Sequence, residues 1–329
     1  MKRVYISKFN GVTDMCEKIA QALEWIGGYS IVKAQSRVFI KPNLTYPFYK
    51  RGVTTSPEMI EAIVVALLNQ TSNITIVESD GGGGAWTADE AFQGHNLLNI
   101  AEKYNVSLVN LSRGPLQYVE ATVGEVVIGI DLPSILLNEV DVFITVPVPK
   151  LHHMTGVSLA FKNQWGCIPD RMRMRHHPEF AQKVIAVNKL LNPRMVIFDG
   201  TYFLDGLGPV EGDPVMMELL IASNDIGAGT LACCQIMGYD PHQSKHLRVA
   251  LKEGLMPSSL SKCKMNTSIE LYTSHKFHLT KRPLQSWAAL WAFNHRFGTN
   301  LFYLWPTAKP LHKLLYLLKS RPNGFKAGY

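Results

Sequence analysis

The chain has 329 residues, of which 47% are hydrophobic and 18% charged, so it can bury a sizeable core and is not a disordered protein. The formal net charge is +7, but nine Lys or Arg and no Asp or Glu follow Glu270, which leaves −2 for residues 1–270. This distribution argues against a protein devoted to nucleic-acid binding and favours a basic tail that meets an anionic surface.

Strand-like and helix-like segments alternate along the body of the chain. The expected strands are rich in Val and Ile and cover residues 3–6, 37–40, 74–78, 106–110, 141–148 and 194–200. The expected helices cover residues 56–70, 88–105 and 177–192. Residues 117–132 alternate differently and indicate a hairpin or a small insertion before the strand at 141. This order predicts an α/β fold with a mainly parallel sheet, helices on both faces and a C-terminal helical extension.

Three regions follow from composition. We expect an α/β body at residues 1–256, a boundary segment rich in Ser and Lys at 257–274, and a basic aromatic helical tail at 275–329. Aromatic and basic residues crowd 284–320, as in helices that lie at a membrane interface. Aromatic stripes also pack in protein cores, so a small helical cap on the body is the alternative.

The cysteines and the N-terminus bear on location and cofactors. The five cysteines show no C-x-x-C spacing, so we expect no iron–sulfur cluster and no structural zinc site in this chain. No apolar signal region follows the first residues, and no window of about 18 apolar residues suggests a membrane span. These features predict a cytoplasmic protein with free thiols.

Polar residues follow several predicted strands. Lys41, Glu78, Lys150 and Asp199 each stand at the carboxyl end of one. Because the carboxyl ends of parallel strands lie at one edge of a sheet, we expect these four side chains to gather at a single site. Taken one at a time, each could equally point to water or cap a helix.

The stretch KLHHMTGVSLAFKNQWG carries several cationic or titratable groups. Lys150 and His152 come directly after a predicted strand. A helix starting near Thr155 would place Ser158 and Lys162 one turn apart on the same face. Such groups at the end of a strand predict a binding or catalytic site.

A run of four glycines follows the strand that ends at Glu78. Gly81, Gly82 and Gly83 are candidate ligand-binding positions, because backbone amides in such a loop can turn toward an anion. The run matches neither common phosphate-loop pattern, so a flexible loop is the alternative. Glu78 and Asp225 are candidate metal ligands, and Asp225 also fits a helix cap.

Residues 171–178, RMRMRHHP, hold three arginines and two histidines. They could bind phosphate groups, or they could form a solvated loop that orders over the site. In both cases they add positive charge next to it.

The ordered series KPN, E-x-D-G, K-x-H-x-x-x-G-x-S-x-x-x-K-N-x-x-G, D-G, G-x-G-P-x-x-G-x-P and N-D-x-x-A resembles the domain-of-unknown-function family 362, from about Lys41 to Gly238. The resemblance implies a bacterial or archaeal cytosolic protein, often encoded with or fused to a ferredoxin-like iron–sulfur module, and no agreed reaction. The motif positions it carries over are Lys41, Pro42, Asn43, Glu78, Lys150, His152, Gly156, Ser158, Lys162, Asn163, Gly166, Asp199, Gly208, Gly212 and Asp225.

The chain departs from the family pattern twice. It has no cysteine-rich ferredoxin segment. The family also tends to have a second Asp four residues after position 225, where this chain has Gly229. If two carboxylates normally share a metal ion or a proton there, this chain has lost half of that arrangement.

These observations predict an enzyme that acts on an anionic small molecule bearing carboxylate or phosphate. The predicted catalytic residues are Lys150 and Lys162, which would stabilise negative charge, His152 as general acid or base, and Asp199, which would orient it. The predicted ligand-binding residues are Lys41, Asn43, Gly81, Gly82, Gly83, Ser158 and Asn163.

Cofactor and partners are less closely defined. A divalent metal is a candidate cofactor, and only the family context suggests a separate electron-transfer protein; we expect no nucleic-acid partner. The alternative function is a non-catalytic ligand-binding or scaffold protein, attached peripherally to the inner face of a membrane through residues 284–320.

Overall fold

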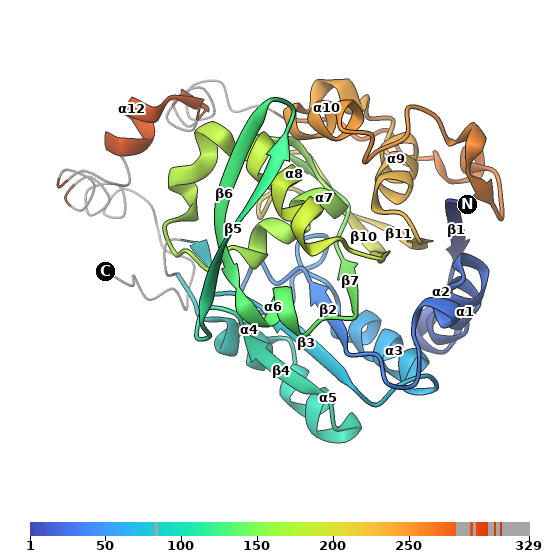
Figure 1. Ribbon diagram of the computed structural model, residues 1–329. Helices are drawn as coiled ribbons and strands as arrows, with labels where there is room; N and C mark the ends of the chain where they lie inside the picture. The colour runs from blue at the N-terminus through green and yellow to red at the C-terminus, as the bar shows by residue number, and fades with distance from the viewer. Residues whose placement is uncertain (83–84, 281–289, 292–293, 302–305, 307–309, 311–329) are drawn as a thin grey trace.

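The computed structural model of the protein describes residues 1–82, 85–280, 290–291, 294–301, 306 and 310 (Figure 1). Within these residues, a mixed ten-stranded sheet has the order β12-β1-β11-β10-β7-β2-β3-β4, and the short strands β8 and β9 branch from β10. Its strands are Arg3–Lys8 (β1), Val38–Pro42 (β2), Ile74–Glu78 (β3), Ser107–Asn110 (β4), Val142–Val146 (β7), Lys150–His152 (β8), Gly156–Ser158 (β9), Met195–Asp205 (β10), Asp213–Ser223 (β11) and Lys264–Met265 (β12).

The half of the sheet from β10 to β4 is entirely parallel. In the other half, strand β11 lies between β10 and β1 and runs antiparallel to both. The prediction of a mainly parallel sheet is therefore confirmed, with an antiparallel strand on one side that the sequence patterns did not reveal.

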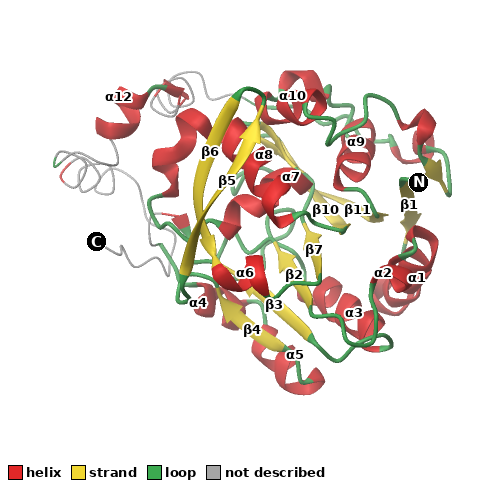
Figure 2. Ribbon diagram, viewed as in Figure 1, coloured by secondary structure: helices red, strands yellow, loops and turns green. Residues whose placement is uncertain are grey.

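Alternating residues of the central strands face two different cores. Val38 and Ile40 of β2 pack into one hydrophobic cluster, whereas Phe39 between them packs into the other. Successive side chains of a strand point to opposite faces, so both faces need a covering layer. Helices α1, α3 and α5 cover the first face, and α7, α8 and α9 cover the second (Figure 2).

The described helices confirm the expected layers but shift some boundaries. Their bounds are Gly11–Ile26 (α1), Gly28–Ile31 (α2), Pro57–Leu68 (α3), Ala88–Gly94 (α4), Leu97–Tyr104 (α5), Ser134–Asn138 (α6), Ala160–Asn163 (α7), Phe180–Leu191 (α8), Ile226–Ile236 (α9), Lys245–Lys252 (α10) and Arg296–Thr299 (α12). The single helix expected at 88–105 is wrong, because Asn96 adopts a left-handed conformation with φ 59° and divides it into α4 and α5.

The hairpin predicted at 117–132 is confirmed as Leu116–Val123 (β5) and Val126–Pro133 (β6), which form a separate two-stranded sheet packed on α8. The segment 257–274 lies against the body, where β12 pairs in parallel with β1. Most of the predicted helical tail lies outside the described residues. Residues 275–280 are described and lie against the body, where His275 pairs with Asp205; of the rest of the tail, the structure describes α12 and a few neighbouring positions (Figure 1).

Candidate functional site

The structure contains a cavity of about 770 Å³ beside the carboxyl ends of β2 and β3. Lys41, Glu78 and Lys150, three of the four residues expected to converge, line it together. Asp199, the fourth, does not line it. The elements that enclose the cavity also include the β8–β9 hairpin, the 3-10 helix Arg173–Glu179 and α10.

Lys41 and Glu78 form a buried ion pair on the cavity wall, with 2.6 Å between Lys41 Nζ and Glu78 Oε2. Lys41 also donates to the carbonyl of Pro42 at 2.8 Å, and Glu78 accepts from the backbone of Leu44 at 3.2 Å. A Cβ at Gly166 would lie 2.9 Å from Glu78 Oε1 and 3.0 Å from Lys41 Nζ, so a larger residue there would displace the pair. The two charges neutralise each other.

Lys150 lies in the same wall, 1% exposed, but it has no carboxylate partner in the part of the chain that the structure describes. Its Nζ donates to the carbonyl of Val53 at 2.5 Å. Burial lowers the pKa of Lys150 well below its ordinary value, and the positive charges of Lys162 and Lys41 lower it further. The amine is therefore poised to gain a proton when an anion enters.

His152 follows on the same strand and is 5% exposed. The backbone N–H of Met154 donates to His152 Nδ1 at 3.2 Å, which leaves the proton of the neutral ring on Nε2. Burial, then the charge of Lys162, lowers the pKa of His152 well below its ordinary value. The ring is therefore neutral near pH 7 and can relay a proton.

The helix predicted to start near Thr155 is wrong. Residues 150–158 form the β8–β9 hairpin, which turns through Gly156 at φ 80°, and α7 begins only at residue 160. Ser158 is therefore on a strand, opposite Lys150 in register, and Lys162 is on a helix. Both still line the cavity.

Lys162 and Asn163 of α7 both line the cavity, but Asn163 is held by hydrogen bonds. Asn163 is buried and donates to the carbonyl of Lys41 at 3.0 Å and to Thr145 Oγ1 at 2.9 Å. Lys162 faces the cavity, and burial together with the charge of Arg173 lowers its pKa to about 8. Asn163 thus braces the end of β2, while Lys162 is available to a ligand.

The arginine-rich segment folds over the cavity. Arg173 is 8% exposed and donates to Ser79 Oγ at 2.8 Å and to the carbonyl of Ile168 at 2.7 Å. His177 also lines the cavity, and its ring stacks on Trp165 with 5.9 Å between centroids. Arg173 therefore keeps its charge close to the cavity, and phosphate binding by this segment stays a prediction.

The predicted glycine loop contributes less than expected. Gly81 and Gly82 line the cavity, but the Gly81 amide donates to the carbonyl of Trp86 at 2.9 Å, and the Trp86 ring covers Gly81. Gly83 lies outside the described residues. Asn43 lines the cavity, and its side-chain amide donates to the carbonyl of Val53 at 3.3 Å.

Asp199 is hydrogen-bonded to Ser56 and Thr201, away from the cavity. Its Oδ2 accepts from the backbone of Ser56 at 2.7 Å and from its hydroxyl at 2.8 Å, and its Oδ1 accepts from the Thr201 hydroxyl at 2.6 Å. Ser56 is the N-cap of α3. Asp199 therefore fixes the start of this helix and does not reach His152 through the cavity.

Asp225 is the N-cap of α9, accepting from Ala228 at 2.7 Å, and it pairs with Lys2 at 2.9 Å. It does not line the cavity, so the structure does not bring it together with Glu78. A Cβ at Gly229 would lie 2.7 Å from Val196 Cγ1. Gly229 is thus required by packing in this chain.

Several residues that line the cavity belong to no sequence motif, so the sequence did not predict them. Trp165 and Phe180 form an aromatic wall with 4.8 Å between centroids, and Trp86 lines the cavity as well. His246 is 1% exposed, its Nε2 has no partner among the described residues, and burial and Lys162 lower its pKa to about 3. Helix α10 adds basic residues to the rim: Lys245, Arg248 and Lys252.

A part of the C-terminal tail reaches the cavity. Leu290 and Asn294 contribute to its lining, and Lys245 donates to Asn294 Oδ1 at 3.0 Å. Arg296 of α12 pairs with Glu179. These described positions therefore pack on the body at the rim of the cavity.

The described residues also bear on the predictions about metal ions, membrane spans and cysteines. No three His, Cys, Asp or Glu side chains there are grouped so that they could hold a metal ion. Within the same residues, no helix is both long and apolar enough to cross a bilayer. The five cysteines are free thiols.

The profile of the family described as Domain of unknown function (DUF362) matches residues 38–235. A thylakoid-associated protein of Synechocystis sp. is 27% identical over 246 residues, which make up 72% of this chain and 74% of that protein. The solved lactate racemase apoprotein from Thermoanaerobacterium thermosaccharolyticum matches with a TM-score of 0.47 and 14% identity, over 71% of this chain and 56% of that one.

A crystal structure of a protein from Thermotoga maritima matches with a TM-score of 0.40 and 12% identity, over 75% of this chain and 60% of that chain. The chain therefore spans somewhat more than half the length of these two solved structures.

Proposed function

The chain belongs to the DUF362 family, as its motifs predicted, and on this premise we propose that it is an enzyme whose cavity binds an anionic small molecule and transfers a proton on it. The family description assigns no reaction, so the proposal depends on the cavity itself. The observation that carries it is the imbalance of charge among the lining residues.

Among the described lining residues, seven are Lys or Arg and one is a carboxylate, which Lys41 already neutralises. A buried cation without a counterion is unfavourable, because its hydration is lost and nothing replaces it. This cost holds the pKa of Lys150 well below its ordinary value and that of Lys162 at about 8. A ligand with carboxylate or phosphate groups would supply the missing charge, which favours anion binding over a neutral ligand.

His152 is the proposed acid or base. Its Nδ1 is occupied by the backbone of Met154, so Nε2 is the nitrogen left for proton transfer. Lys150 and Lys162 would stabilise negative charge as it develops on the ligand. A divalent ion bound with the help of Glu78 stays a prediction. A separate electron-transfer protein also stays a prediction.

Binding of simple anions tests the proposal first. Isothermal titration with inorganic pyrophosphate and with citrate should show binding to the wild-type protein, and Lys150→Met should weaken it at least tenfold. Lys103→Met is the matched control, because Lys103 is an exposed lysine paired with Glu61. Native mass spectrometry with metal analysis, on protein purified without chelator, would identify any ligand or ion that the protein retains.

Turnover tests the catalytic half. The wild-type protein should consume one or a few anions from a metabolite extract, and His152→Gln should still bind them but consume none. Wild-type protein that binds neither probe anion, retains no ligand and consumes nothing would overturn the proposal.

Peripheral membrane attachment is a second candidate function, supported by one observation. The 27% identical relative is named as thylakoid-associated, and the present chain has a basic, aromatic segment at 284–320. The full chain should then sediment with vesicles containing anionic lipid, while a chain ending at residue 274 should not. Sedimentation that is equal for both chains would contradict this candidate.

A further inference from the structure

We propose that Lys162 is a nucleophile that forms an imine with a carbonyl group of the anionic ligand. This inference rests on the proposed function of the same cavity and narrows its ligand to an anion that also carries an aldehyde or ketone, such as an oxo acid or a phosphorylated sugar.

Lys162 differs from the other two interior lysines of the cavity. Lys41 is paired with Glu78, and Lys150 is bound to the carbonyl of Val53. Lys162 is half-buried, faces the cavity and has no hydrogen-bond or ion-pair partner among the described residues. Its amine is therefore both accessible to a ligand and not held by the protein.

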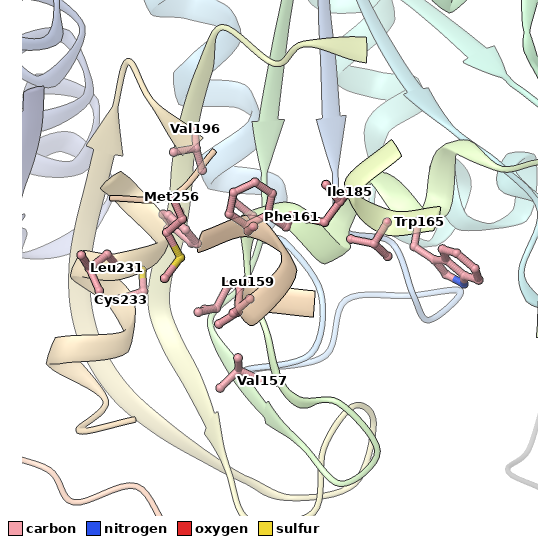
Figure 3. Packing of buried hydrophobic residues seen from close by; sticks show 14 of the residues in the cluster. Val157, Leu159, Phe161, Trp165, Ile185, Val196, Leu231, Cys233 and Met256 are labelled. Atoms are coloured by element: carbon pink, nitrogen blue, oxygen red, sulfur yellow. The ribbon is translucent and has the colours of Figure 1, made fainter. Parts of the chain in front are cut away.

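The helix that carries Lys162 is held rigidly. Phe161 is fully buried and belongs to the same hydrophobic cluster as Val196 (Figure 3). On the other side of Lys162, Asn163 donates to Thr145 Oγ1 at 2.9 Å, and Thr145 in turn donates to Gln164 at 2.7 Å. With its neighbours fixed in this way, α7 presents the Lys162 amine at a defined place in the cavity.

The groups around Lys162 keep the amine uncharged for part of the time near neutral pH. The positive charge of Lys162 lowers the pKa of the titratable groups that face it, which are Lys150 and His152 of β8, His177 of the covering 3-10 helix and His246 of α10. The charge of Arg173 in turn lowers the pKa of Lys162. Burial and Arg173 lower the pKa of Lys162 to about 8. Only a neutral amine attacks a carbonyl, and desolvation beside another cation is a known way to produce one.

The chemistry balances without any co-reactant. The nitrogen lone pair of Lys162 attacks the carbonyl carbon, so a C–N bond forms while the C=O π bond breaks, and one amine proton passes to the oxygen to give a neutral carbinolamine. Loss of that oxygen as water, with the second amine proton, gives the neutral imine. The imidazoles of His152 and His246 line the cavity and can relay both protons.

Reductive trapping tests the inference. The full-length protein is mixed with pyridoxal 5′-phosphate, a phosphorylated aldehyde, at pH 8, reduced with sodium borohydride and digested for peptide mass spectrometry. We expect a reduced adduct on Lys162 that forms at least tenfold faster than on exposed lysines. Lys162→Arg should lose this adduct, while Lys103→Arg should keep it. Excess pyrophosphate should suppress labelling of Lys162 and leave surface labelling unchanged.

The outcomes separate the two proposals. If pyrophosphate binds but Lys162 labels no faster than exposed lysines, the imine is overturned while anion binding stands. If pyrophosphate does not bind and Lys162 is not labelled, both fail. Because the labelling rate is read on the wild-type protein, the test holds even if Lys162→Arg folds poorly.

Discussion

Lys41 and Lys150 are each 1% exposed in the wall of one cavity, and among the described residues only Lys41 has a carboxylate partner. The two lysines therefore have opposite roles. Lys41 completes an ion pair that the folded protein needs. Lys150 has no counterion among the described residues, and a bound anion can supply one.

Breaking the Lys41–Glu78 pair should destabilise the protein strongly. Lys41→Met leaves the Glu78 carboxylate buried without a counterion, which costs about 3–5 kcal/mol. Lys41→Met combined with Glu78→Gln should recover part of this loss, because no charge is then left unpaired. Urea unfolding of the two single variants and the double variant measures the coupling. Additive losses would contradict the pairing.

Anion binding should be linked to proton uptake. The pKa of Lys150 lies well below its ordinary value and that of Lys162 is about 8, and a bound anion raises both. Binding of pyrophosphate should therefore take up protons and weaken several-fold between pH 7 and pH 9. Titration calorimetry in two buffers of different ionisation enthalpy gives the proton count. An affinity that is constant over this range would contradict the prediction.

Two fully buried histidines should make the protein sensitive to mild acid. Burial lowers the pKa of His95 to about 4 and of His246 to about 3. The unfolded chain binds these protons below about pH 6.5 and the folded chain does not, so the stability is complete above pH 6.5 and declines as the pH is lowered. Each of these histidines should lower the free energy of unfolding by on the order of 2 kcal/mol at pH 5 relative to its value above pH 6.5.

Urea midpoints measured from pH 7 to pH 5 test this. Paired carboxylates contribute at lower pH, so this window isolates the histidines. His246→Phe keeps a ring beside Phe180 and should remove about a quarter of the pH dependence, because burial also lowers the pKa of His152 and His177. An unchanged dependence in this variant would assign the effect to other groups.

Restoring the family's second acidic residue should damage the fold. Gly229→Asp would place its Cβ 2.7 Å from Val196 Cγ1 and bury a carboxylate without a partner, costing more than about 3 kcal/mol. Gly114→Asp is the matched control, because no atom lies within 4 Å of a Cβ added there. Thermal unfolding compares the two. Equal midpoints would show that the helix can shift to accept a side chain.

The sequence determined the class of fold and most of the interior of the site. Apolar strands alternating with helical segments require a sheet covered on both faces, and a parallel sheet brings its strand ends to one edge. Lys41, Glu78, Lys150, His152 and Lys162 could therefore be assigned to one place without coordinates. This assignment depends only on local pattern and chain direction.

Only the tertiary structure decided which of these charges are neutralised. Asp199 looks like Glu78 in the sequence, yet it fixes the start of a helix in a distant segment, at Ser56. Asp225 caps its own helix through Ala228, as its position in the sequence also allowed. Arg173, His246 and the basic rim of α10 reach the cavity only through packing. Burial and pairing depend on all neighbouring elements at once, and a one-dimensional pattern does not contain them.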